Sequence, residues 1–139
     1  MSPRHSLQGF TLIELMVAVA ILGIRAALAY SSYTAQAQQG RRSDALNALG
    51  SLSQSLERCY AQNYTYTGCP AVPAAVTSST NGYYQVTATP AATGYTLVAV
   101  PTGVQAKDTI CAKLIQSNSG QSAQNSAGTD QTQTCWGSR

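Results

Sequence analysis

Charged residues and the usual catalytic side chains are scarce in this 139-residue sequence. Charged residues make up 9% of the chain, and the formal net charge is only +3. The single histidine, His5, precedes the long apolar segment. The acids are Glu14, Asp44, Glu57, Asp108 and Asp130. Catalysis needs a nucleophile with a base, paired carboxylates or a metal cluster, so we expect a non-enzymatic protein with no catalytic residues, no cofactor and no metal site.

The motifs that mark zinc, redox and phosphate sites are also missing. No C-x-x-C pair and no glycine-rich phosphate loop occurs in the sequence. Structural disulfides, which persist in oxidising compartments, are therefore the favoured role of the cysteines. Four cysteines permit three pairings, and closeness in the sequence favours Cys59 with Cys69 and Cys111 with Cys135. Together with the many Ser, Thr, Gln and Asn residues, this predicts an extracytoplasmic domain.

An apolar segment of about 21 residues runs from Phe10 to Tyr30, long enough as a helix to span a hydrocarbon core of about 30 Å. Arg4 lies on its short side, so the positive-inside rule places residues 1–9 in the cytoplasm. The remainder of the chain would then face the oxidising side. Two simpler interpretations compete, namely a plain membrane anchor and a secretory signal cleaved near Ala27-Leu28-Ala29.

Glu14 does not suit either simpler interpretation. An ionisable side chain near the bilayer centre costs about 2.5–3.5 kcal/mol, and a plain anchor gains nothing from it. A desolvated carboxylate is tolerated when a cation pairs with it, so Glu14 predicts a cationic partner. Arg25, the second charge of the segment, lies close enough to the far interface for its side chain to snorkel.

The residues around Glu14 resemble the processing motif of type IV pilins and pseudopilins, because Gly9 is followed by FTLIELM. The resemblance implies that a membrane-embedded prepilin peptidase cuts between Gly9 and Phe10 and methylates the new amine of Phe10. It also implies that Glu14 meets the N-terminal ammonium of a neighbouring subunit during assembly. Two positions depart from the family pattern, which usually has an apolar residue at Arg25 and often a proline at Ser31. The choice between a major and a minor subunit therefore stays open.

A second helical pattern follows the apolar segment and predicts one helix from about residue 11 to residue 62. Its apolar stripe has alternating spacings of four and three residues, and consists of Ala45, Leu49, Leu52, Leu56 and Cys59. The stripe is expected to pack on a sheet. The other faces are assigned to Arg41, Arg42, Asp44, Gln54 and Arg58. Gly40-Arg41-Arg42 is interpreted as a solvated or lipid-headgroup-facing turn in preference to a nucleic-acid contact.

Three strands are predicted in the remaining sequence, at residues 83–88, 95–100 and 109–115, separated by Pro and Gly turns. The expected fold class is α+β, with a long N-terminal helix packed on a small antiparallel sheet of three to four strands, as in the type IV pilin fold. The expected parts are a leader at 1–9, a transmembrane and filament-core helix at 10–30, an amphipathic helix at 31–62 and a head at 63–139. Residues 118–134 show no apolar pattern, so we expect a recognition loop closed by Cys111 and Cys135.

The resemblance implies a structural subunit of a type IV pilus, made in the inner membrane and then displayed on the bacterial surface for adhesion, twitching motility or DNA uptake. The implied partners are further copies or other pilins through the N-terminal helix, the prepilin peptidase and the inner-membrane assembly platform. Two alternatives stay open, a pseudopilin of type II secretion and a DNA-receptor minor pilin. Nucleic-acid binding has weak support, because the basic residues of the head are only Arg58, Lys107, Lys113 and Arg139.

Overall fold

The computed structural model describes residues 10–69 and 77–137 of the chain. They fall into two compact units that meet in the sequence between Ala37 and Gln38, and each unit is described separately. The expected leader, residues 1–9, lies outside the described residues, as does Arg139.

Helix α1 begins in the first unit and runs over Leu12–Asn63, a length of 52 residues. Thr11 caps its N-terminus, because the backbone N–H of Glu14 donates to Thr11 Oγ1 at 3.3 Å. A threonine cap followed by a glutamate at the third helical position is a favourable helix start, since the acid also suits the positive end of the helix dipole. The helix expected at residues 11–62 is confirmed to within one residue at each end. It contains a segment that is long and apolar enough to cross a membrane.

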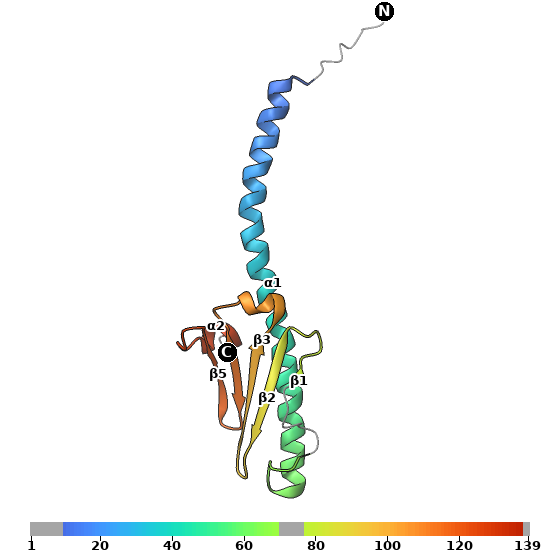
Figure 1. Ribbon diagram of the computed structural model, residues 1–139, viewed down its shortest axis with the longest axis vertical. Helices are drawn as coiled ribbons and strands as arrows, with labels where there is room; N and C mark the ends of the chain where they lie inside the picture. The colour runs from blue at the N-terminus through green and yellow to red at the C-terminus, as the bar shows by residue number, and fades with distance from the viewer. Residues whose placement is uncertain (1–9, 70–76, 138–139) are drawn as a thin grey trace, which may run out of the picture. The chain divides into compact units, whose positions relative to one another are not determined.

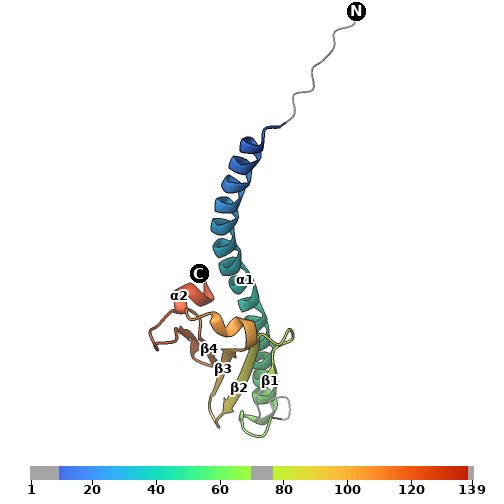
Figure 2. The same cartoon turned by 45° about the horizontal axis from the view of Figure 1, so that its top comes forward.

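The second unit contains a five-stranded antiparallel sheet in which each strand pairs with its neighbours in the sequence. The strands are β1 (Thr77–Ser78), β2 (Tyr84–Pro90), β3 (Tyr95–Pro101), β4 (Lys113–Ser117) and β5 (Gly120–Gln124). A 3-10 helix, η1 (Gly103–Lys107), connects β3 to β4, and a short helix, α2 (Thr132–Trp136), follows β5. Figure 1 shows this meander, and Figure 2 shows η1 and α2 at the same end of the sheet.

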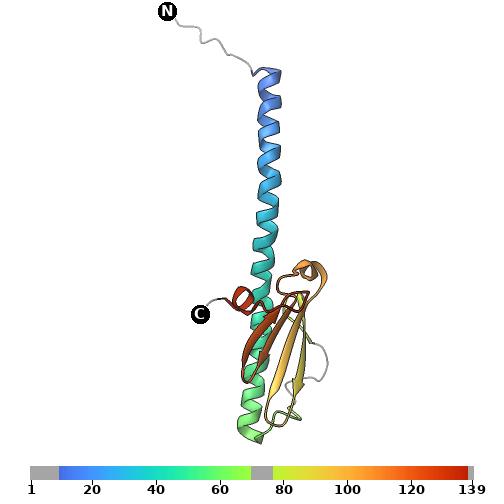
Figure 3. The ribbon, with the colours of Figure 1, turned by 90° about the vertical axis from the view of Figure 1, so that its left-hand side faces the viewer.

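The core lies between one face of this sheet and the part of α1 that belongs to the second unit, as Figure 3 shows. Leu49 and Leu56 of α1 are fully buried there. Every second side chain of β2 and β3 points towards the helix, because successive side chains of a strand point to opposite faces of the sheet. The buried side chains are Tyr84, Val86 and Ala88 of β2 and Tyr95, Leu97 and Ala99 of β3. A fully buried leucine stabilises the fold by about 1.5–3 kcal/mol relative to an exposed one. The expected α+β fold, with a leucine stripe packed on a sheet, is confirmed.

The sheet differs from its prediction in the C-terminal half of the chain. The third strand was expected at 109–115 but lies at Lys113–Ser117. The backbone N–H of Cys111 donates to Asp108 Oδ1 at 3.2 Å, which holds the residues before β4 in a bend. The sheet also has five strands where three to four were expected, because β1 and β5 carry no apolar alternation. In β5 only Ala123 is buried, so the strand has no hydrophobic signature.

Both expected disulfides are present. Cys59 joins Cys69 just after α1, and Cys111 joins Cys135, which connects the start of β4 to α2. An aromatic cluster lies beside the first disulfide. The ring of Tyr66 stacks on Tyr60 at 4.5 Å between centroids and meets the edge of Tyr95 at 5.1 Å. The two disulfides thus stabilise opposite ends of the sheet.

Candidate functional site

The first candidate surface is the N-terminal part of α1, residues 12–29, where every side chain is exposed. Its large apolar side chains are at least half exposed, and comprise Leu12, Ile13, Leu15, Met16, Val17, Val19, Ile21, Leu22, Ile24 and Leu28. A protein in water rarely exposes an apolar patch of this size, so lipid or another protein is expected to cover it. We call this surface the assembly segment.

Two charged side chains, Glu14 and Arg25, lie on the assembly segment, and both are exposed. When a bilayer or another subunit covers the segment, the carboxylate of Glu14 loses its water and requires a cation with hydrogen-bond donors. An α-ammonium provides both. Phe10, whose amine the resemblance assigns to this role, is the first described residue and is 86% exposed. Gly9, the other expected processing residue, lies outside the described residues.

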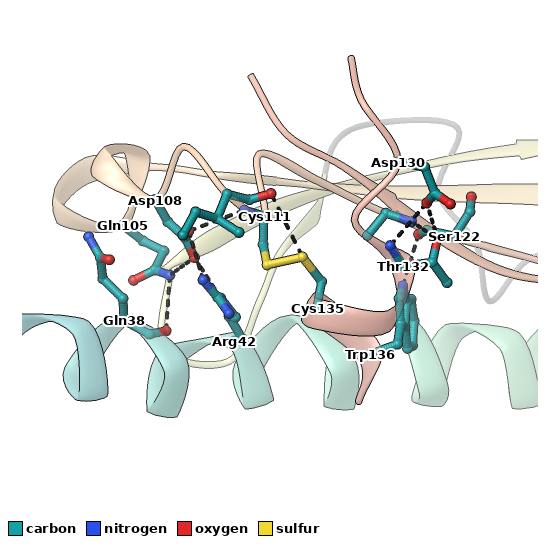
Figure 4. Close-up of a disulfide and its surroundings, with 12 residues drawn as sticks. Gln38, Arg42, Gln105, Asp108, Cys111, Ser122, Asp130, Thr132, Cys135 and Trp136 are labelled. Carbon is teal, nitrogen blue, oxygen red and sulfur yellow. Dashed lines mark hydrogen bonds and ion pairs between the residues drawn. A yellow bond between two sulfur atoms is a disulfide. The ribbon is translucent and has the colours of Figure 1, made fainter. Parts of the chain in front are cut away.

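The second candidate region begins with a buried ion pair that joins α1 to the residues after η1. Arg42 Nε donates to Asp108 Oδ2 at 2.7 Å and Arg42 Nη2 donates to Asp108 Oδ1 at 2.9 Å, as Figure 4 shows. The Asp108 side chain is only 1% exposed. Burial alone would raise the pKa of the Asp108 carboxyl, but the hydrogen bonds from Arg42 and Cys111 hold that pKa below its ordinary value. The pair is therefore ionised and bidentate, which is the strongest geometry for such a contact.

Gln105 of η1 extends this contact to the backbone of α1. Its Nε2 lies 3.1 Å from each of three acceptors: Gln38 O, Tyr84 Oη and Asp108 Oδ2. Figure 4 shows Gln38 and Arg42 extending from the helix towards Gln105 and Asp108, which lie above it. Gln105 Oε1 is buried without a hydrogen-bond partner among the described residues. The network fixes η1 to the helix and leaves no free charge there for a ligand.

Asp44 fastens a second loop to the helix. Its carboxylate accepts a hydrogen bond from Ser79 Oγ and two from Asn81, from the backbone N–H and from Nδ2, both at 3.1 Å. Arg42 and Asp44 had been assigned to faces other than the apolar stripe, yet Asp44 is only 5% exposed and the Arg42 side chain 12%. The solvated or headgroup-facing turn expected at Gly40-Arg41-Arg42 was wrong, because these residues are helical and Arg42 is largely buried. The signal was nevertheless present. Gln38 and Arg42 continue the spacing of four and three residues into Ala45 and Leu49, so they lie on the same face as the core leucines.

The region expected to be a loop, residues 118–134, contains β5 and the start of α2, so the expectation of an irregular loop was wrong. The indole Nε1 of Trp136 donates to Ser122 O at 2.8 Å, and the backbone N–H of Ala123 donates to Thr132 Oγ1 at 3.0 Å. A shallow hollow of about 530 Å³ lies between the β4–β5 hairpin and α2. Its lining is neutral and includes Gln116, Asn118, Gln121, Thr132 and Trp136. The structure therefore offers a neutral, hydrogen-bonding surface there, without a catalytic group.

The basic side chains of the second unit lie at two ends of the sheet. Lys107 ends η1, and Lys113 begins β4; β3 ends and β4 begins at the same end, because Ala99 pairs with Leu114. The Arg41 guanidinium belongs to this end as well and lies 5.1 Å from the ring centroid of Tyr83. Arg58 is exposed at the other end, beside Cys59. Lys107 and Lys113 therefore lie at the same end of the sheet.

Comparison with known proteins identifies relatives for both parts of the chain. Residues 4–30 match the prokaryotic N-terminal methylation motif, and residues 31–115 match the family described as type IV minor pilin ComP, DNA uptake sequence receptor. The fimbrial protein EcpC of Eikenella corrodens is 34% identical over 77 residues, which cover 55% of this chain and 50% of the relative. A fimbrial protein of Pseudomonas aeruginosa is 49% identical over 51 residues, which cover 34% of this chain and 33% of the relative. The matched part of the chain therefore spans half or less of these relatives.

Proposed function

Because the chain belongs to the type IV pilin family, in the group described as type IV minor pilin ComP, DNA uptake sequence receptor, we propose that it polymerises into a surface pilus through its assembly segment. The observation that supports this most directly is an apolar helical surface that is exposed throughout residues 12–29 and carries one carboxylate, Glu14. Packing such helices together buries the apolar side chains and excludes water. The fimbrial relatives favour a pilus over a secretion pseudopilin.

The proposal assigns the start of assembly to processing between Gly9 and Phe10. Before the cut, the assembly segment would hold the subunit in the inner membrane, where the prepilin peptidase and the assembly platform act on it. The cut creates the ammonium of Phe10, which is methylated and then pairs with Glu14 of a neighbouring subunit. Pairing offsets the desolvation of both charges. An uncut chain has no free amine at that depth and would carry a polar leader into an apolar filament.

The test expresses a variant at Glu14 in a strain from which the wild-type gene for this chain has been deleted. We expect Glu14→Val to insert into the membrane and to be processed normally, because valine is apolar, but to enter filaments poorly, because the ammonium of its neighbour loses its partner. Processing is read from the mass of the mature N-terminus, and assembly from sheared filaments, scored for both filament number and incorporation. Val17→Ile, an apolar exchange on the same segment, is the matched control.

Two results would contradict the proposal. Sheared filaments that contain Glu14→Val in wild-type amounts would show that the carboxylate is not an assembly contact. A mature chain that starts at Met1 or Tyr30 would show that the segment is an anchor or a secretory signal instead.

A role in DNA uptake is the second candidate function, and the match to the DNA uptake sequence receptor family over residues 31–115 favours it. The match covers η1, the first three strands and the beginning of β4. We infer that filaments containing this chain retain double-stranded DNA. Sheared filaments from strains with and without the chain are incubated with labelled DNA at fixed salt, and deletion is expected to lower DNA retention. Equal retention by both preparations, with equal filament mass, would exclude this role.

A further inference from the structure

One end of the second unit combines exposed apolar and basic side chains. Only four large hydrophobic side chains are exposed in the described part of this unit, and three of them fall within residues 100–110: Val100, Val104 and Ile110. Four of the exposed side chains between residues 104 and 113 are spaced three positions apart and are alternately apolar and basic: Val104, Lys107, Ile110 and Lys113. We call the surface formed by these four residues and Arg41 the η1 end. An apolar surface flanked by lysines is typical of proteins that rest in a membrane interface.

The charges of the η1 end are available for an anionic partner. Of the two nearby buried carboxylates, Asp108 is neutralised by Arg42, whereas Asp44 accepts hydrogen bonds only from the neutral groups of Ser79 and Asn81. The exposed acid nearest in the fold is Asp130, which is bridged to Gln124 and whose carboxylate accepts from Thr132. Lys107 and Lys113 are exposed, and Arg41 is half-buried, with its guanidinium 5.1 Å from the ring centroid of Tyr83. The η1 end therefore presents a modest excess of positive charge beside apolar side chains.

The η1 end is attached to α1 close to the assembly segment along the chain. Gln105 binds the carbonyl of Gln38, and Asp108 binds Arg42. Only residues 30–37 separate Gln38 from the end of the assembly segment, and eight helical residues reach about 12 Å. The headgroup layer of one leaflet is about 5–8 Å thick. When the assembly segment spans a membrane with its helix upright, Gln38 therefore lies a few ångströms beyond the headgroups, and contact of η1 with them requires α1 to tilt, as transmembrane helices commonly do.

We propose that the η1 end docks on anionic phospholipid headgroups while the subunit waits in the membrane, an inference that rests on the membrane insertion proposed above. Val104 and Ile110 enter the boundary between headgroups and acyl chains, and Lys107 and Lys113 contact lipid phosphates. Docking orients the second unit before the subunit enters a filament. Once the subunit has entered the filament, the η1 end no longer contacts the lipid. The apolar side chains between the lysines favour a lipid interface over DNA, which is bound mainly through dense positive charge.

The test uses the full chain reconstituted into vesicles of phosphatidylcholine alone or mixed with phosphatidylglycerol. Flotation of the chain with both kinds of vesicle measures insertion, and hydrogen exchange of the backbone amides of residues 103–113 measures docking. We expect these amides to exchange up to about thirtyfold more slowly in the anionic vesicles, the effect of two lysines near a charged surface. Lys107→Glu with Lys113→Glu should remove the difference, and Val104→Ser with Ile110→Ser should reduce it. Arg58→Glu, at the other end of the sheet, is the matched charge control and should leave it unchanged.

The outcomes separate this proposal from the proposed function. If the chain floats with both vesicles but residues 103–113 exchange equally fast in both, docking is wrong and insertion stands. If the chain floats with neither, insertion fails and docking falls with it. If Lys107→Glu with Lys113→Glu weakens binding of double-stranded DNA but leaves exchange in anionic vesicles unchanged, the η1 end is a DNA surface and the lipid proposal is overturned.

Discussion

Single polar residues on the core face of α1 determine how the loops of the second unit are held. Arg42 and Asp44 lie beside the leucine stripe, and each binds a loop that is far away in the sequence: Arg42 binds Asp108, 66 residues later, and Asp44 binds Ser79 and Asn81. A buried ion pair gains little net stability over an apolar pair, but loss of one partner leaves a buried charge uncompensated. These residues therefore matter more for the position of η1 and the β1–β2 connection than for the size of the core.

Asp108→Asn tests this at the residue scale. The variant leaves the Arg42 guanidinium buried without its counter-charge, so we expect the free energy of unfolding to fall by about 3 kcal/mol or more. The measurement is thermal or urea unfolding of the full chain in a mild detergent. Asp130→Asn is the control: Asp130 is exposed, and the amide keeps an oxygen that can accept from Thr132. An equal, small effect of both changes would mean that the ion pair does not hold η1.

The same pair predicts the acid sensitivity of the fold. The folded pKa of Asp108 lies below its ordinary value of 3.8, so its contribution to stability is fully present above that value. The contribution is lost as the pH falls through the lower, folded pKa, because the unfolded chain then binds the proton more readily. The wild-type chain should therefore lose stability below about pH 4 more steeply than Asp108→Asn. This prediction is contradicted if the free energy of unfolding of the two proteins falls equally steeply below about pH 4.

At the scale of elements, the C-terminal hairpin depends on tethers more than on hydrophobic burial. In β5 only Ala123 is buried, and the strand is held by pairing with β4, by the indole of Trp136 on Ser122 and by the Cys111–Cys135 disulfide through α2. A strand with so little apolar surface gains little from the hydrophobic effect. Its order therefore depends on links that bring it to the sheet edge.

Cys111→Ser combined with Cys135→Ser should consequently loosen β5 and α2. Chain-entropy arguments assign about 3.5 kcal/mol to closing a loop of this length, so the thermal midpoint should fall and the amides of residues 120–136 should exchange faster. Cys59→Ser with Cys69→Ser is the matched control, because it removes a disulfide at the other end of the sheet and should leave those amides protected. Processing at Phe10 should be normal in both. An unchanged midpoint and unchanged exchange would show that the disulfide does not order the hairpin.

At the scale of the whole molecule, low charge limits how the chain can bind DNA. The net charge is +3 over 139 residues, and the described part of the second unit has four cations outside the buried ion pair, namely Arg41, Arg58, Lys107 and Lys113. The logarithm of the binding constant for duplex DNA falls linearly with the logarithm of the salt concentration, and each phosphate that a cation neutralises makes this slope steeper by about 0.9. A single subunit can therefore supply only a weak, sequence-independent attraction, and tight capture requires several subunits or contacts to the bases.

The salt dependence of DNA binding measures this limit. For the isolated full chain in detergent, we expect the logarithm of the binding constant to fall with the logarithm of the salt concentration with a slope no steeper than about −4. Arg58→Glu or Lys107→Glu should each make the slope shallower by about one unit if its cation contacts a phosphate. A markedly steeper slope for the isolated chain would show that cations beyond these four take part.

The sequence by itself determined the features that depend on local patterns. The bounds of α1, the apolar assembly segment with Glu14, the strands near β2 and β3 and both disulfide pairings were predicted from hydrophobic period, turn residues and cysteine spacing. Each of these signals lies within a short stretch of chain, so the backbone period alone reveals it.

Only the tertiary structure decided which distant polar groups meet. The displaced start of β4, the presence of β5 and the burial of Arg42 and Asp44 depend on contacts between segments tens of residues apart. β5 has neutral side chains and one buried alanine, so no hydrophobic period marked it. The spacing of residues along α1 places Arg42 on the leucine face, but it does not reveal whether solvent or a distant loop covers that charge. Burying such a group is favourable only where its partners are delivered by the fold, which is why the packed structure, and not the local sequence, determined these positions.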